Sequence, residues 1–246
     1  MQHEFAMRER NTERNTGRNT EEVLSYTGPG AAFTNNFVTL TGQVASIELN
    51  TQSTQSQVEN SVDPIQIQTT FLLSVARLSG MVDHLPIVVG SEIADTLAVG
   101  DIVTVRGKFV SFNKIIGDKS KLILQVYAEE VDQCGAGTDM TSVQNPNSIT
   151  LVGFVCKPPI YRTTPFNREI ADLLLAVNRA VNKSDYIPAI AWGRNARLAK
   201  GLMVGEKVHI EGRVQSREYQ KRLPDDTVET RIAYEVSINH IEKIEN

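Results

Sequence analysis

Residues 100–107 read Gly-Asp-Ile-Val-Thr-Val-Arg-Gly, and residues 205–212 repeat the pattern as Gly-Glu-Lys-Val-His-Ile-Glu-Gly. In the second copy Val208 and Ile210 alternate with His209 and Glu211. Alternation with a period of two is typical of a strand that buries one face. The stretch therefore predicts the same β-strand at two places in the chain.

Four further pairs of segments recur in the same order, which indicates a duplicated unit of about 100 residues. They are residues 37–44 with 148–155, 71–77 with 173–179, 83–86 with 185–188, and 122–131 with 232–241. Each unit is mostly strand, with one short helical stretch between strands three and four, at Ser91–Leu97 and at Asn195–Leu202. That order is typical of the OB fold, whereas an immunoglobulin-like sandwich has about seven strands and no such helix. We predict an all-β protein of two tandem five-stranded OB-fold barrels.

The domain boundaries follow from the repeat. Residues 36–133 form the first unit and residues 147–246 the second, with residues 134–146 as a linker that contains Gly135, Gly137 and Pro146. Residues 1–35 repeat Arg-Asn-Thr and offer little to bury, so a disordered polar tail is expected. The stretch Asn50–Gln68 is rich in Gln, Ser and Thr and predicts a long mobile loop.

Charge is distributed unevenly between the units. The whole chain has a net charge of −4. Residues 147–246 carry 15 Lys and Arg against 12 Asp and Glu, while residues 36–133 carry 6 against 11. A binding site for a polyanion is therefore expected mainly in the second unit.

The second unit resembles the bacterial single-stranded DNA-binding protein family over nearly its whole length. The segments that carry the resemblance are residues 147–153, 159–162, 175–179, 185–188, 192–196, 204–205, 208–213 and 217–219. The resemblance implies an OB barrel that binds single-stranded DNA without sequence preference, in replication, recombination or repair. It also implies a homodimer, since family members present four barrels and this chain carries two. Family members commonly end in an acidic tail that recruits partners, whereas this chain ends in Glu242-Lys243-Ile244-Glu245-Asn246, so recruitment through such a tail is not expected.

Two outward strand faces combine flat aromatic side chains with cations, as the binding of single strands requires. One face holds Tyr186, Pro188, Ile190 and Trp192, with Arg194 just beyond. The other holds Arg213, Gln215, Arg217 and Tyr219. The predicted nucleic-acid-binding residues are Tyr161, Arg162, Arg179, Tyr186, Trp192, Arg194, Arg213, Arg217, Tyr219 and Lys221.

Several of these residues have a second interpretation. Trp192 could instead belong to the barrel core, because tryptophan is largely buried on average. Arg213 and Arg217 could be ordinary solvated charges. Tyr234 is expected to pack between layers rather than to bind.

The first unit departs from the family pattern. His84 stands where the second unit has Tyr186, and Trp192 has no counterpart because Val89 is followed directly by Gly90. Arg106, Lys108, Phe109 and Phe112 remain. We expect a weak DNA site, a spacer or an assembly domain.

Catalytic chemistry finds no support in the sequence, which predicts no enzyme, no metal and no cofactor. The glycine pairs lack the Lys and Ser or Thr of a phosphate loop, and the four histidines lie on different elements without ligand spacing. Cys134 and Cys156 are expected to be reduced structural thiols. The chain has no run of about 18 apolar residues and no secretion signal, so a cytoplasmic protein without a membrane partner is expected.

The function predicted is therefore sequence-independent binding of single-stranded DNA. The alternative is an OB-fold adaptor or primosome-like structural protein that acts mainly through protein contacts. The two differ in affinity for oligo(dT), which in a DNA binder falls steeply with salt.

Overall fold

The structure, a computed structural model, describes residues 35–48, 68–117, 119–135, 137–180, 183–223 and 226–245. The predicted disordered tail lies outside these residues except for Asn35. The predicted loop Asn50–Gln68 also lies outside them, except that Gln68 begins a strand. No helix in the described part of the chain has the length and apolar character that crossing a membrane requires.

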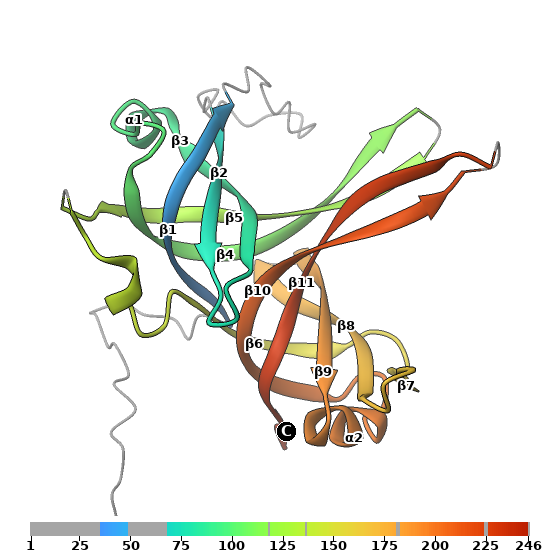
Figure 1. The fold of residues 1–246 in the computed structure, drawn as a ribbon. Coiled ribbons are helices and arrows are strands. Elements are labelled where there is room, and N and C mark those ends of the chain that lie inside the picture. The colour runs from blue at the N-terminus through green and yellow to red at the C-terminus, as the bar shows by residue number, and fades with distance from the viewer. Residues whose placement is uncertain are drawn as a thin grey trace, which may run out of the picture. The chain divides into compact units, whose positions relative to one another are not determined.

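The first repeat forms five strands and one short helix (Figure 1). They are β1 (Asn36–Glu48), β2 (Gln68–Ala76), β3 (Val82–Gly90), α1 (Ser91–Ala94), β4 (Ile102–Ile116) and β5 (Lys119–Gln133). A 3-10 turn, η1 (Met140–Ser142), follows before the second repeat begins.

The second repeat contains one strand more than predicted. Its elements are β6 (Asn147–Val155), β7 (Ile160–Thr163), β8 (Glu169–Ala180), β9 (Lys183–Trp192), α2 (Arg194–Lys200), β10 (Lys207–Arg222) and β11 (Val228–Lys243). The additional strand is β7, which pairs with β8. Pro158 and Pro159 separate it from β6, because proline lacks the N–H that a continuing ladder needs.

Both helices lie between the strands that the sequence indicated, but they are shorter than predicted. Past α1 the N–H groups of Thr96 and Leu97 donate to carbonyls three residues earlier, and those of Gly201 and Leu202 do the same past α2. Bonds of this spacing form tighter 3-10 turns, which end an α-helix. The predicted residues Asp95–Leu97 and Gly201–Leu202 therefore lie outside the helices.

The strand pairings form one closed circuit in each repeat. In the first repeat each strand pairs with the next in the order β1, β2, β3, β5, β4 and back to β1. In the second repeat the order is β6, β8, β9, β11, β10 and back to β6. The pairs β3–β5 and β9–β11 are parallel, and the other pairs are antiparallel. The two circuits thus have the same order of strands, as expected of a duplicated unit.

A contact between β1 and β6 joins the two circuits into one eleven-stranded sheet. The pairing is antiparallel and centred on Val38 opposite Ile149, with Asn36 opposite Leu151 and Leu40 opposite Asn147. The sequence-based prediction of two tandem barrels did not include this pairing. It connects the halves by main-chain hydrogen bonds rather than through the linker alone.

The structure explains why the repeated stretch, residues 100–107 and 205–212, ends in glycine in both copies. Each copy, Gly107 and Gly212, lies at a β-bulge in the pairing with the next strand. A Cβ atom would lie 2.1 Å from the carbonyl oxygen of Tyr127 at Gly107, and 2.3 Å from that of Ser237 at Gly212. Only glycine permits so close an approach of two strands.

Buried apolar side chains from both repeats belong to one cluster. Among the largest are Leu40 and Phe71 in the first repeat and Leu151, Leu175 and Ile210 in the second. The predicted burial of alternate residues in β10 is confirmed, because Val208, Ile210 and Val214 are fully enclosed. Tyr234 packs against this core, and burial raises the pKa of its hydroxyl.

The ends of β4–β5 and of β10–β11 extend as long two-stranded hairpins away from the other strands (Figure 1). The far part of each hairpin leaves large apolar side chains exposed, among them Ile115 and Ile116 in one and Val228 and Ile232 in the other. At the opposite end of the second repeat, α2 lies close to β7, with Lys200 Nζ 4.7 Å from the centroid of the Tyr161 ring.

Candidate nucleic-acid interface

The outward face of β9 presents two aromatic side chains to solvent. Trp192 is 41% exposed and Tyr186 is 46% exposed. Between them, Pro188 is partly covered and Ile190 is buried. The predicted row of alternating residues is present, but only its aromatic ends are open to a ligand.

Strand register brings Arg162 onto the same face as Trp192. Arg162 lies opposite Ile170 in the β7–β8 pair, and Ile170 lies opposite Trp192 in the β8–β9 pair. The three residues therefore form one row across three strands. The Arg162 guanidinium also binds Asp172, with 2.9 Å between Nη2 and Oδ2. An exposed ion pair of this kind contributes little stability, so Arg162 can exchange the carboxylate for a phosphate at small cost.

Tyr161, the neighbour of Arg162, faces the other way. Its ring packs against the core, and its hydroxyl donates to Glu169 Oε1 at 2.5 Å. This hydrogen bond raises the pKa of Tyr161. The structure thus places Tyr161 near α2 and away from Trp192, whereas Arg194 is exposed as the first residue of α2.

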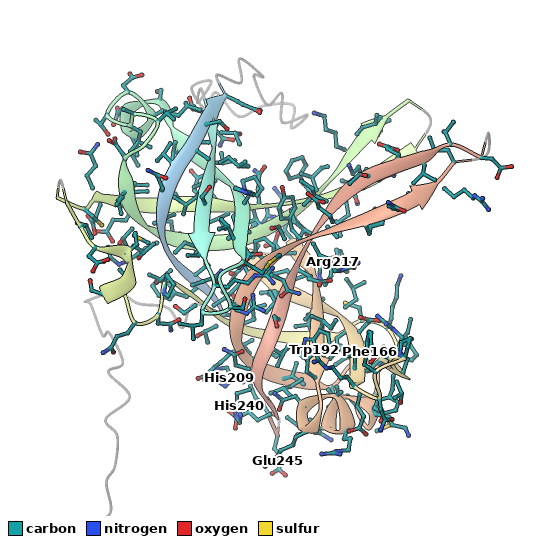
Figure 2. The ribbon with its side chains drawn as sticks, viewed as in Figure 1. Phe166, Trp192, His209, Arg217, His240 and Glu245 are labelled. Carbon is teal, nitrogen blue, oxygen red and sulfur yellow. The ribbon has the colours of Figure 1, made fainter. Side chains whose placement is uncertain are left out.

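A second group of predicted residues lies on β10. Arg217, Tyr219 and Lys221 are exposed, and the Arg217 guanidinium lies 5.8 Å from the centroid of the Tyr219 ring. Arg217 Nε also lies 3.4 Å from Glu235 Oε1. Arg217 lies where the β10–β11 hairpin leaves the other strands, whereas Trp192 lies nearer to α2 (Figure 2).

Arg179 and Arg213 are both engaged between the two repeats, although 39% of the Arg179 side chain remains exposed. Arg179 donates from Nε to Asp185 at 2.9 Å and from Nη2 to the carbonyl oxygen of Ser111 at 2.9 Å. Arg213 Nη1 is buried 3.7 Å from Asp83 Oδ2. Burial, together with the positive charge of the nearby Arg77, lowers the pKa of Arg213. The period of two located Arg213 on the outer face, but it did not show that Asp83 of the first repeat lies against it.

The first repeat pairs two of its cations, Arg106 and Lys108, with its own carboxylates. Arg106 binds Glu130 and Asp132, and Lys108 binds Glu129 at 2.6 Å. Phe109 lies in the core. In the β2–β3 pair Gly90 lies opposite Gln68, and in the β8–β9 pair Trp192 lies opposite Ile170. Gly90 therefore occupies the position of Trp192 in the first repeat, which has no aromatic ring there.

A half-open groove of about 770 Å³ nevertheless lies on the outer face of the first repeat. Its lining includes Phe112, Tyr127 and Lys114 from the first repeat and Arg179 from the second. The sequence did not indicate this groove, because its walls come from strands far apart along the chain.

Two further features were missed from the sequence. Phe166 in the turn between β7 and β8 is 87% exposed, although the turn residues Thr164-Pro165-Phe166-Asn167 could have signalled it. Asp83 and Asp185, which marked the repeat, are buried polar residues whose role the repeat did not explain. Within the described ranges, no group of three or more His, Cys, Asp and Glu side chains could hold a metal ion.

Comparison with known proteins finds relatives of the second repeat. Residues 146–244 match the Single-strand binding protein family. Single-stranded DNA-binding protein 1 of Staphylococcus aureus is 36% identical over 87 residues, which are 31% of this chain and 50% of that protein. Single-stranded DNA-binding protein A of Bacillus subtilis is 34% identical over 83 residues, 31% of this chain and 48% of that protein. The chain thus spans about half the length of these relatives.

A solved structure extends the likeness of fold across both repeats. The single-stranded DNA-binding protein from Thermus aquaticus, in its wild-type form, matches with a TM-score of 0.60 and 20% sequence identity. The match covers 86% of this chain and 93% of that chain. The mostly β fold described above is therefore shared with that protein. Residues 146–244, less than half of this chain, are thus similar in sequence to the single-strand binding protein family.

Proposed function

We propose that this protein binds single-stranded DNA without sequence preference and without catalysing a reaction. The observation that carries the proposal is the exposed face of the second repeat, where Trp192, Tyr186 and Arg162 share one side of β7–β8–β9. Flat rings accept bases of any sequence, and cations bind the phosphates between them. The same repeat matches the family.

Each closed circuit of strands is proposed to be an OB-type barrel, with α1 or α2 between its third and fourth barrel strands. The order of strands and the parallel contact in each circuit support this assignment. Residues 36–133 and 147–246 are then two domains, and residues 134–146 connect them.

The two barrels are proposed to contribute unequally to binding. The second carries the exposed tryptophan and the positive charge balance, while Arg106 and Lys108 in the first are paired with acidic side chains. The first barrel serves mainly assembly, and a homodimer supplies four barrels to one strand. Coating of exposed strands in replication, recombination or repair is the role that such binding suits.

A titration with oligo(dT) at several salt concentrations tests the proposal. Trp192 is the only tryptophan in the chain, so its fluorescence reports contact with a base. We expect quenching on binding, and an affinity that falls linearly on a logarithmic scale as salt rises, because phosphate contacts release counterions. An affinity that is absent at low salt would reject DNA binding and favour an adaptor that contacts proteins.

A further inference from the structure

Phe166 is the most exposed aromatic side chain in the described part of the chain, with 87% of its surface open to solvent. It lies in the turn between β7 and β8, at the side of the second repeat where Trp192 also lies (Figure 2). A single exposed apolar side chain is common on protein surfaces, so what distinguishes Phe166 is the turn that holds its ring and the charges around it.

Hydrogen bonds hold the turn that presents Phe166. The N–H of Thr164 donates to the carbonyl oxygen of Arg168 at 2.8 Å, and the N–H of Asn167 donates to that of Thr164 at 2.9 Å. The N–H of Arg168 also donates to Thr164 Oγ1 at 3.1 Å. Asn167 has φ 58°, a left-handed conformation that asparagine tolerates well. The ring is thus held ready on an ordered turn, which reduces the entropy lost when a ligand binds.

The β7–β8 hairpin that carries Phe166 and the helix α2 that contacts it are strongly basic in an otherwise acidic chain. Residues 157–172 and α2 contain two carboxylates, Glu169 and Asp172, against six exposed cations. The cations are Lys157, Arg162, Arg168, Arg194, Arg197 and Lys200. Both carboxylates already bind arginines, Arg197 and Arg162 respectively. Among the described residues, Arg168 and Arg194 make no ion pair, so their charge is available to an anionic ligand.

The turn continues the face that carries Trp192. Thr164 and Arg168 each lie two residues beyond the row of Arg162, Ile170 and Trp192, and therefore on the same side of the hairpin. The N–H of Gly193 donates to the carbonyl oxygen of Glu169 at 2.9 Å, which ties the end of β9 to the base of the turn. A strand stacked on Trp192 and directed across β8 toward the β7–β8 turn consequently meets Phe166 next.

We propose that Phe166 and the basic surface around it form an extension of the binding site, where the ring stacks on a base beyond the one at Trp192. Arg168 and Arg194 contact the phosphates that flank this base. The proposal rests on the single-stranded DNA binding proposed above. A ring among unpaired cations matches the ligand chemistry of a nucleic-acid strand, which alternates flat bases with single negative charges.

The test uses the full chain with oligo(dT) of increasing length, from about 4 to about 16 nucleotides, the range that one OB fold occupies. Phe166→Leu removes the aromatic ring and keeps an apolar side chain, while Phe166→Tyr keeps a ring and serves as the matched control. Affinity is measured by competition against a labelled oligonucleotide, and Trp192 quenching is recorded in the same samples. Circular dichroism melting confirms that both variants fold.

We expect Phe166→Leu to bind the shortest oligonucleotides as the unchanged chain does and longer ones about fivefold more weakly, with quenching at saturation unchanged. Loss of one stacked base costs at least about this factor. Phe166→Tyr should bind all lengths with the affinity of the unchanged chain. Arg168→Gln should lower the slope of log affinity against log salt by about 0.7, for the longer oligonucleotides only.

Equal affinity of Phe166→Leu and the unchanged chain at every length would overturn the proposal, while quenching of Trp192 would still support the proposed function. A chain that neither binds oligo(dT) nor shows quenching would overturn both. If Phe166→Leu instead weakened binding of a poly-glutamate peptide and left oligo(dT) binding intact, the surface would serve an acidic protein partner.

Discussion

The carboxylate of Asp185 in β9 accepts a hydrogen bond from the main-chain N–H of Ser111 in β4, with 2.6 Å between Oδ1 and N. The reciprocal bond joins Asp83 Oδ1 and the N–H of Ser216 at 2.7 Å. Asp83 and Asp185 occupy matching positions of the repeat, and so do the two serines. Each carboxylate also binds an arginine of its own repeat. The repeats therefore meet as the two copies in a symmetric dimer do, because the aspartate of each repeat contacts the matching serine of the other.

Replacing Asp185 with Ala should lower the free energy of unfolding by about 1–3 kcal/mol, because it leaves the buried N–H of Ser111 without its acceptor and removes the carboxylate partner of Arg179. Asp185 is 1% exposed, so water cannot replace the carboxylate. Urea denaturation measures the loss. Asp172→Ala, which removes an exposed ion pair with Arg162, should cost no more than about 1 kcal/mol. Equal losses in the two variants would contradict a structural role for Asp185.

Trp192→Ala should weaken oligo(dT) binding by about 1–3 kcal/mol, the typical contribution of one stacked base. The side chain is 41% exposed, so its removal leaves no closed cavity and the melting temperature should change little. Tyr219→Ala should behave in the same way. Calorimetry and binding on the same samples decide between stacking and packing. If Trp192→Ala melts early and its folded fraction binds normally, the residue belongs to the fold.

Arg217→Ala should reduce the slope of log affinity against log salt by about 0.7, since a contact to one phosphate of single-stranded DNA releases about that much counterion. Arg179→Ala provides the contrast. Its guanidinium is bound to Asp185 and to the Ser111 carbonyl, so we expect lower stability and an unchanged salt slope. If the salt slope changed for Arg179→Ala and not for Arg217→Ala, then Arg179 would be the phosphate contact and Arg217 would not.

Acid should weaken the fold partly through Glu206. Lys243 Nζ lies 2.6 Å from its Oε1, and the Met203 N–H lies 3.0 Å from its Oε2. Both contacts hold the pKa of Glu206 below its ordinary value of 4.5. The stabilisation is therefore complete above pH 4.5 and is lost as the pH falls through the lower, folded-state pKa. Glu206→Gln should be less stable than the unchanged chain at pH 7, and the difference should shrink at pH 3 in urea titrations.

Light scattering should give the mass of a homodimer at micromolar concentration, with and without oligo(dT). If each chain supplies two barrels, as proposed, a pair of chains would present four, and twofold pairing is the commonest closed arrangement. The exposed apolar side chains of the two hairpins, such as Ile115 and Ile232, offer surface for such a contact. A monomeric mass under both conditions would exclude the dimer.

Much of the secondary structure could be predicted because the repeat and the period of two are local signals. Residues 205–212 alternate so regularly that the strand and its buried face follow from the order of residues alone. The positions of Tyr186 and Trp192 on the outer face of β9 could be predicted for the same reason. The short strand β7 could not, since four residues between Pro159 and the turn carry too little pattern.

The sequence by itself determined the duplicated unit, the alternation of its strands and the rings that alternation directs outward. Only the tertiary structure decided which cations share that surface. Arg213 and Arg217 look equivalent along the chain, yet Asp83 of the first repeat engages Arg213, while Arg217 stays exposed. Strand periodicity fixes the face of a side chain from its immediate neighbours. What covers that face is fixed by residues far away, such as Ser111 opposite Asp185 and Ser216 opposite Asp83, which meet only after the chain has folded.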